Sequence, residues 1–141
     1  MAVKEAGNKI AFKYKDNGEI VEITYSDFAQ QVTWLGSALT QMGFSDKHIA
    51  CIGNNSYKWV LAYLTVLKSA GVFVPIDKEL PANDIFHILN ESECSVVFYT
   101  KTHENLFMNN TNKLPNVKYY IGFDLMADSG NFLSFDKLLE H

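Results

Sequence analysis

The sequence lacks several features that would point to a specialised class of protein. Its two cysteines, Cys51 and Cys94, have no CxxC pair or cysteine–histidine spacing around them, so we expect reduced, buried thiols in place of a disulfide or a metal site. Its longest apolar stretch, residues 59–67, is about half as long as a bilayer span, and its first residues do not form a signal peptide. We therefore expect a cytoplasmic protein without a transmembrane segment.

Clustered positive charge is also missing. The formal net charge is −4, and no lysine-rich run occurs, whereas nucleic acids and anionic membranes select for clustered basic residues. Hydrophobic residues make up 48% of the 141 residues and charged residues 20%, which is ordinary for one compact, folded domain. The composition therefore indicates a globular protein that does not bind nucleic acid.

The common catalytic motifs are absent as well. The chain has no GxxxxGK phosphate loop, no GxGxxG after a strand, no GxSxG elbow and no HExxH pair. The histidines His48, His87 and His103 are isolated: we expect His87 on a solvated helix face and His48 as a satisfied residue at the start of a strand. Glu91 and Glu93 are expected to be solvated charges at a helix end. We therefore assign no catalytic residue and no metal ligand, and the cofactor-binding residues stay unknown.

The first ordered element is predicted to be a β-hairpin. Two short β-type runs, Ile10–Tyr14 and Ile20–Ile23, flank an Asn17-Gly18 pair, and both residues of such a pair tolerate the positive φ that a tight turn requires. Thr24, followed by Asp27, then predicts a capped helix start. The helix itself shows an apolar stripe and a glycine stop, made up of Phe28, Val32, Leu35, Leu39, Met42 and Gly43.

The rest of the chain alternates between apolar strands and helices. Strands are predicted at residues 48–52, 72–76, 96–99 and 117–121, and helices at 57–69, from Pro81 onward and at 135–139, with a weakly patterned stretch at 101–115. Strands of continuous apolar character that alternate with helices are typical of a parallel sheet covered on both faces. The predicted fold is therefore α/β, with a mostly parallel sheet and helices on both faces, preceded by a β-hairpin.

The helix at 57–69 is the most apolar element. Ser56 is a suitable cap, and Lys58, Thr65 and Lys68 mark one narrow polar face, so we expect deep burial of the remaining surface. Trp59 and Tyr63 lie four residues apart, a spacing that fits core packing better than a binding box. Two residues are predicted to shape the segment after this helix: Gly71 as a left-handed helix terminator and Asp77 as the anchor of a loop.

Two stretches resemble a known family. Ile23–Phe28 resembles the first core motif of AMP-forming acyl-CoA synthetases, members of the adenylate-forming ligase superfamily, and Leu67–Pro81 (LKSAGVFVPIDKELP) resembles the second. Between them, GNNSYKWVLAYLTVL resembles the asparagine-containing turn and buried helix of the same enzymes. The resemblance continues to the strand at 95–99 and covers roughly residues 9–100. Within the superfamily, Val74–Pro81 looks most like bacterial long-chain fatty-acid–CoA ligases.

The resemblance implies a function and also a limit to it. The family joins a carboxylate to the α-phosphate of ATP with Mg²⁺ and then passes the acyl group to the thiol of CoA. The segments that carry this chemistry in the family, including its phosphate loop and its C-terminal lysine, are missing from this sequence. We therefore expect ATP, Mg²⁺, CoA and a fatty acid to be ligands of a longer parent enzyme, with none bound to this chain alone, which we predict to be inactive.

Alternative interpretations remain. The chain could belong to an amino-acid-adenylating domain that loads a carrier protein, or it could be a stand-alone α/β binding module. On the domain boundaries, we expect residues 1–138 to form an N-terminal subdomain of an AMP-binding ligase and residues 139–141, Leu-Glu-His, to be a possible expression-tag remnant. Either ligase interpretation predicts an apolar face left uncovered, and with it a tendency to self-associate.

Overall fold

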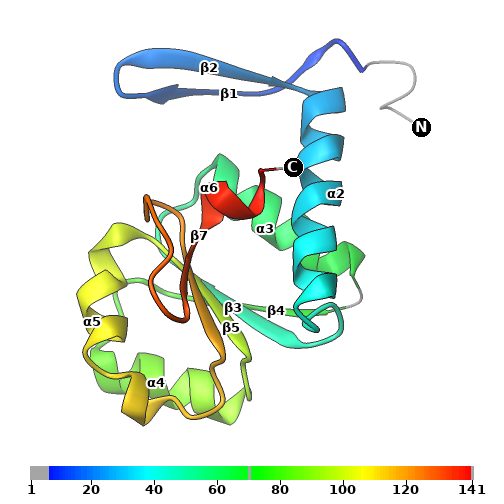
Figure 1. Cartoon of the computed structure of the whole chain (residues 1–141). Helices are drawn as coiled ribbons and strands as arrows, with labels where there is room; N and C mark the ends of the chain where they lie inside the picture. The colour runs from blue at the N-terminus through cyan, green and yellow to red at the C-terminus, as the bar shows by residue number, and fades with distance from the viewer. Residues whose placement is uncertain (1–6, 70, 141) are drawn as a thin grey trace.

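The computed structural model describes residues 7–69 and 71–140 and shows a two-stranded hairpin beside a five-stranded sheet with helices on both faces (Figure 1). The predicted fold class is confirmed. In chain order the elements are β1 (Ile10–Asp16), β2 (Glu19–Thr24), α2 (Tyr25–Gln41), β3 (His48–Ile52), α3 (Tyr57–Lys68), β4 (Val72–Ile76), α4 (Ala82–Glu91), β5 (Val96–Tyr99), the 3-10 turn η1 (Lys101–His103), α5 (Glu104–Met108), the 3-10 turn η2 (Thr111–Lys113), β6 (Tyr119–Gly122), β7 (Phe132–Ser134) and α6 (Phe135–Leu138). Ala70 of the second motif and His141 of the suspected tag lie outside the described residues.

The hairpin forms as its turn sequence predicts. β1 and β2 pair antiparallel, and Asn17 and Gly18 between them have φ values of 52° and 82°. Positive φ at both central residues is the geometry that suits the right-handed twist of two strands joined by a tight turn. The hairpin packs on the body through Phe12, whose ring centroid lies 5.0 Å from that of Phe28 and 5.1 Å from that of Tyr57.

Helix α2 begins and ends where the sequence indicates. The side chain of Thr24 accepts a hydrogen bond from the backbone N–H of Asp27 at 3.1 Å, which satisfies one of the free donors at the helix start. Gly43 follows the helix with φ of 87°, so the left-handed stop is confirmed. Of the predicted apolar stripe, Val32, Leu35 and Leu39 are buried.

Ser56 caps helix α3 as predicted, but the side of the helix that is exposed is not the polar face that the sequence predicts. Thr65 is fully buried and its Oγ1 donates to the carbonyl of Leu61 at 2.6 Å. Tyr63 and Leu67 are instead exposed, so the prediction of near-complete apolar burial is wrong. The reason is that packing against α2 and the sheet buries Leu61, Ala62 and Val66 together with Thr65, whose hydroxyl is satisfied within its own helix.

The left-handed conformation predicted for Gly71 depends on Ala70, which lies outside the described residues. What the structure shows at Gly71 is a lack of space, because a Cβ there would lie 3.0 Å from the carbonyl oxygen of Lys47 and 3.1 Å from Cγ1 of Val66. Beyond it, β4 is an edge strand, which is where a proline such as Pro75 can lie without interrupting the interior of a sheet. The anchoring role of Asp77 is confirmed, since its Oδ1 accepts the backbone N–H of Glu79 at 2.9 Å.

The strands of the large sheet run parallel in the order β4-β3-β5-β6-β7. The sequence did not predict β7, which is only three residues long and too short to show a period. The weakly patterned stretch at 101–115 forms η1, α5 and η2. Ser134 caps α6 through a hydrogen bond from the N–H of Lys137 at 3.3 Å, as its sequence position indicates.

Two separate apolar cores cover the two faces of the sheet. One joins α2, α3 and α6 to the sheet through side chains such as Leu35, Leu61 and Phe135, and the other joins α4 and α5 through Ile85, Leu89 and Phe107. In Figure 1 the first layer lies above the sheet, next to the hairpin, and the second lies below it. The sheet is therefore buried on both sides, which explains its continuous apolar strands. No helix in the described part of the chain is long and apolar enough to cross a membrane.

Candidate functional site

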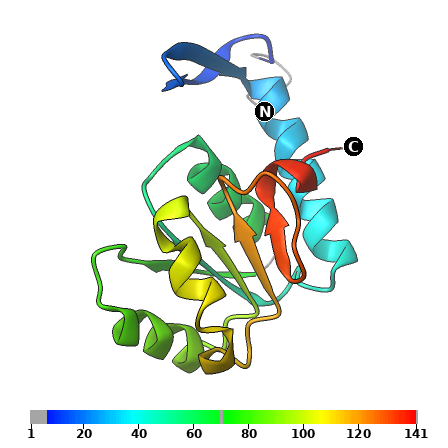
Figure 2. The same ribbon diagram turned by 60° about the vertical axis from the view of Figure 1, so that its left-hand side comes forward.

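The carboxyl ends of the parallel strands form the most distinctive surface of the molecule. β3 lies between β4 and β5, and the helices that connect these strands, α3 and α4, cover opposite faces of the sheet. Where two consecutive connections leave a strand toward opposite sides of the sheet, a crevice forms at the carboxyl ends of the strands. Ligands of open α/β sheets usually bind in this crevice. The strands point toward the end of the molecule where the hairpin lies (Figure 2), and three residues of β1, Tyr14, Lys15 and Asp16, line a hollow at this edge.

A hollow of about 490 Å³ occupies this edge. It is lined by the end of β1, by the loop between β3 and α3 with the start of α3, and by the segments that follow β5 and β6: Tyr14, Lys15, Asp16, Asn54, Asn55, Ser56, Tyr57, Lys58, Thr100, Lys101, Thr102, Phe123 and Asp124. Most of these side chains can donate or accept hydrogen bonds. The hollow therefore suits a polar ligand, and its walls come from four separated parts of the sequence.

The β3 and β5 loops touch where the crevice begins. Gly53 has φ of 141°, and a Cβ built on it would lie 2.5 Å from Cγ2 and 2.6 Å from Oγ1 of Thr100. Because both the backbone conformation and the available space exclude a side chain, only glycine fits at this position. This contact fixes how far the two loops separate, and one of its two residues, Thr100, also lines the hollow.

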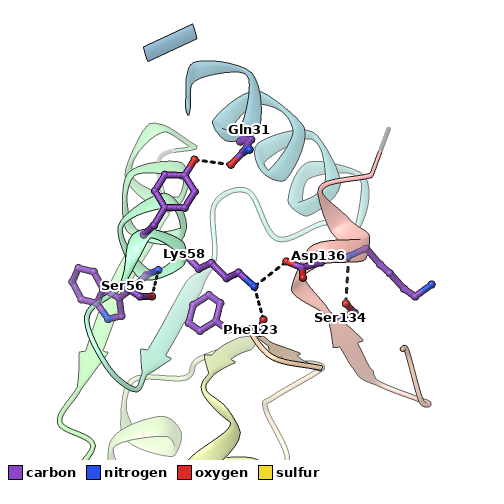
Figure 3. Close-up of polar contacts among 9 residues, drawn as sticks. Gln31, Ser56, Lys58, Phe123, Ser134 and Asp136 are labelled. Atoms are coloured by element: carbon purple, nitrogen blue, oxygen red, sulfur yellow. Dashed lines mark hydrogen bonds and ion pairs between the residues drawn. The ribbon is translucent and has the colours of Figure 1, made fainter. Parts of the chain in front are cut away.

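Lys58 connects three elements at the same edge. Its Nζ donates to the carbonyl oxygen of Phe123 at 2.9 Å and pairs with Oδ1 of Asp136 at 3.0 Å (Figure 3). The ammonium also lies 5.8 Å from the ring centroid of Phe135. The cation near the start of α3 thus binds groups of the protein itself, and it holds the end of β6 and the start of α6 against α3.

Other polar contacts fix the neighbouring loops. Oδ2 of Asp124 accepts the backbone N–H of Lys101 at 3.0 Å, which ties the β6 loop to the β5 loop. Nζ of Lys78 donates to Oδ1 of Asn54, which ties the β4 loop to the β3 loop. Adjacent loops along the carboxyl edge are therefore joined in pairs, and the shape of the crevice is defined before any ligand binds.

A tyrosine at the start of α3 supports the hairpin side of the crevice. The hydroxyl of Tyr57 donates to Oε1 of Gln31 at 2.6 Å, and its ring stacks on that of Tyr14 with centroids 5.6 Å apart. Burial, together with the nearby Tyr14 and the charge of Asp27, raises the pKa of Tyr57 far above its ordinary value. The phenol is therefore neutral and works as a hydrogen-bond donor that orients α3 against α2.

The isolated ionisable residues noted in the sequence do not meet at this edge. His48 begins β3 at the opposite end of the sheet, and its Nδ1 lies 2.8 Å from the carbonyl oxygen of Ser92. His87, Glu91 and Glu93 are exposed on or just after α4, as predicted. No group of three or more histidine, cysteine or acidic residues that could hold a metal ion occurs among the residues that the structure describes.

The thiols and the third histidine are buried. Cys51 and Cys94 are free, as predicted, and lie in the cores on opposite faces of the sheet. Burial raises the pKa of Cys94 to about 11 and raises that of Cys51 further, so both thiols stay protonated at neutral pH. His103 lines a smaller hollow of about 290 Å³ beside the crevice, and its buried Nδ1 has no hydrogen-bond partner among the described residues. Nothing in the local sequence pattern indicated this burial.

Among the described residues, none from either sequence motif lines the hollow of about 490 Å³. Ile23–Phe28 ends β2 and caps α2, and Leu67–Pro81 runs from the end of α3 through β4 to the start of α4. Their side chains act on the backbone: Thr24 as a cap and Asp77 as a turn anchor. The motifs therefore shape the backbone at the start of α2 and in the turn after β4.

Comparisons with known proteins agree with this architecture. Residues 1–137 match the family model of AMP-binding enzymes. A mycosubtilin synthase polypeptide from Bacillus subtilis is 34% identical over 96 residues, which are 67% of this chain and 4% of that protein. Long-chain-fatty-acid–CoA ligase 5 from Rattus norvegicus is 27% identical over 134 residues, 91% of this chain and 20% of that one.

A solved structure shows the same fold. The anthranilate CoA ligase AuaEII, crystallised with anthranoyl-AMP, superposes with a TM-score of 0.84 at 19% sequence identity, over 98% of this chain and 25% of that one. At this identity the likeness concerns the fold alone. In each of these three proteins, the chain spans a quarter of the length or less.

Proposed function

The chain belongs to the AMP-binding enzyme family, and from this we propose that it is the N-terminal part of a cytoplasmic long-chain fatty-acid–CoA ligase. In the proposed reaction a fatty-acid carboxylate oxygen attacks the α-phosphorus of ATP and pyrophosphate leaves. The thiol sulfur of CoA then attacks the acyl carbonyl carbon, and AMP leaves. This chain contributes the N-terminal α/β layer and its carboxyl-edge crevice to that enzyme.

One observation carries the choice of substrate. The run Val74–Pro81, which forms the end of β4 and the loop after it, resembles the second core motif of long-chain fatty-acid–CoA ligases. The similarity to the rat ligase extends over 91% of the chain, compared with 67% for mycosubtilin synthase. The similarity to the rat ligase continues beyond the motifs that both groups of enzymes share. It therefore supports the fatty-acid assignment more strongly than the motifs do by themselves.

A second candidate is an adenylation domain that activates an amino acid for a carrier protein. It is favoured by the higher identity, 34%, to mycosubtilin synthase over 96 residues. Val-Pro-Ile-Asp, at 74–77, is common to both groups of enzymes, so this tetrapeptide does not discriminate between them. A stand-alone α/β binding module is the third candidate, and the two complete apolar cores of the chain are compatible with it.

ATP, Mg²⁺ and CoA are proposed as ligands of the complete ligase. The described residues do not fit Mg²⁺, because they offer no cluster of acidic side chains, and the sequence has no phosphate loop. We therefore derive no chemical step from this chain. Its proposed contribution is positional: Gly53, Lys58 and Asp124 hold the loops that border the crevice at fixed separations.

The decisive experiment is carboxylate-dependent ATP–pyrophosphate exchange with the full parent enzyme, in which palmitate, acetate and a panel of amino acids are offered in parallel. Exchange that depends on palmitate is the expected result. Exchange with an amino acid only would transfer the assignment to the second candidate. A parent enzyme that exchanged with none of these carboxylates would remove the enzymatic assignment and favour the binding module.

A further inference from the structure

The turn of the hairpin contains an asparagine in an unusual setting. Asn17 is the only asparagine of the sequence that a glycine follows, and the pair joins β1 to β2 with positive φ at both residues. Both residues are exposed, and a Cβ built on Gly18 would have nothing within 4 Å. The turn lies at the end of the hairpin that is remote from α2 (Figure 1). The amide of Asn17 is therefore open to water, and no neighbouring side chain shields the backbone of Gly18.

No contact with the body of the protein protects this pair. In the described part of the chain the side chain of Asn17 forms no hydrogen bond, and the N–H of Gly18 donates to no backbone carbonyl of the turns and loops. The contacts that hold the hairpin lie earlier on β1, where the rings of Phe12 and Tyr14 pack on Tyr57. The tip of the hairpin is thus free to react without disturbing the core.

The pair holds both reactants of an intramolecular substitution. When the backbone nitrogen of Gly18 loses its proton to hydroxide, it can attack Cγ of Asn17. The new N–Cγ bond closes a succinimide ring, the Cγ–Nδ2 bond breaks, and Nδ2 takes a proton from water and leaves as ammonia. Glycine favours this step more than any other following residue, because it has no Cβ to hinder the approach to its nitrogen.

We propose that Asn17 is a site of spontaneous deamidation in the folded chain, and that the product loosens the end of the hairpin that lines the hollow. Water opens the succinimide at either carbonyl group. Cleavage of the Cγ–N bond gives aspartate, and cleavage of the bond between the backbone carbonyl carbon and the nitrogen gives isoaspartate, whose main chain runs through Cβ and Cγ. The reaction consumes only water, and the inference does not depend on the proposed function.

The isoaspartyl product does not fit the observed turn. Asp16 pairs with Glu19 directly across the turn, and an extra backbone atom between them changes the length that this register requires. The new carboxylate also lies next to the carboxylates of both residues, and like charges at opposed positions destabilise a strand pair. Tyr14, Lys15 and Asp16 line the hollow of about 490 Å³. Fraying that starts at the turn therefore reaches the wall of the hollow first.

The first test follows the folded 141-residue chain in mildly alkaline buffer by peptide mapping with mass spectrometry. Asn17 should lose its amide at least about tenfold faster than Asn55, which is also exposed but is followed by Ser56, and this ratio corresponds to a barrier lower by about 1.4 kcal/mol. The rate at Asn17 should rise with pH, because the attacking nitrogen must lose its proton. Asn17→Gly, which keeps a residue suited to positive φ and removes the amide, is the control and should not gain the acidic form.

The second test uses the isoaspartyl form, isolated by chromatography. Its β1 and β2 amides should exchange hydrogen faster than those of the fresh chain, and its Tm should be lower by about 3 °C or more. Asn17→Asp, which adds the charge without the extra backbone atom, should melt within about 2 °C of the fresh chain. Equal amide loss at Asn17 and Asn55, or loss at Asn17 only in urea, would overturn deamidation of the folded chain. An isoaspartyl form with unchanged exchange and Tm would overturn the loosening of the hairpin.

Discussion

Gly53 and Thr100 approach each other so closely that a Cβ on Gly53 would lie 2.5 Å from Cγ2 of Thr100. The two residues follow β3 and β5, which are neighbours in the sheet although α3, β4 and α4 separate them in the sequence. Their contact defines the distance between the first two loops of the carboxyl edge. A defect at this point would therefore alter the crevice as well as the stability of the fold.

Gly53→Ala is expected to destabilise the chain by about 2–4 kcal/mol, because the new methyl group meets a stiff β-branched side chain and the backbone φ is positive. Urea unfolding followed by circular dichroism measures the loss. Gly18→Ala, at a positive φ with open space around it, is the control and should cost only about 1 kcal/mol. The Gly53→Ala/Thr100→Ala double variant should recover part of the loss, and strictly additive effects would contradict a direct contact.

Thr65→Glu is expected to cost about 3 kcal/mol or more, since it places a carboxylate in a fully buried position between α3 and α2. Lys68→Glu, three residues further along the same helix and exposed, should change stability by less than about 0.5 kcal/mol. The urea midpoints of the two variants give the comparison. If both variants lost only a little stability, Thr65 would lie on the exposed polar face that the sequence predicts.

Lys58→Met is expected to cost about 1 kcal/mol, mainly through the lost hydrogen bond to the carbonyl oxygen of Phe123. Asp136 is largely exposed, so the ion pair itself is screened by water and contributes less. A double-mutant cycle with Asp136→Asn isolates the pair, and its coupling should stay below about 1 kcal/mol and decrease at high salt concentration. A coupling that is large and independent of salt would show that the pair is shielded from solvent.

The stability of the chain should fall as the pH rises from about 9 to about 11. Burial raises the pKa of Cys94 from 9.0 to about 11, so in this interval the unfolded chain loses a proton that the folded chain keeps. The stabilising contribution is complete below pH 9 and is lost as the pH passes the folded pKa. Urea midpoints between pH 7 and pH 11 should decline less for Cys94→Ala, and identical slopes for the two proteins would contradict a raised thiol pKa in the folded state.

The 141-residue chain by itself should form no acyl-CoA from palmitate, MgATP and CoA. The physical reason is that stabilising the transition state at the α-phosphorus requires positioned cations, and the described residues provide no acidic cluster to hold Mg²⁺. Thioester formation above background, measured in parallel with a heat-unfolded sample, would refute this expectation.

Much of the local structure could be predicted because its causes lie within a few residues. Asn17-Gly18 determines the hairpin turn, and Thr24, Ser56 and Ser134 each accept a hydrogen bond from an N–H three residues later. The continuous apolar strands likewise indicate a sheet buried on both sides. Each of these signals is a property of one short segment, so it can be recognised without knowledge of the partner elements.

What only the tertiary structure decided involves residues that are distant in sequence. The contact of Gly53 with Thr100, the bond of Lys58 to Asp136 and the hollow that β1 helps to line depend on strand order, which local patterns do not encode. Thr65 turned inward because packing against α2, and not helix periodicity, selected which side of α3 is buried. The sequence by itself determined most of the elements, their caps and the resemblance to the family, although not β7 or the short helices of residues 101–113. Long-range packing decided which side chains meet, since the free energy of those contacts exists only once the layers have assembled.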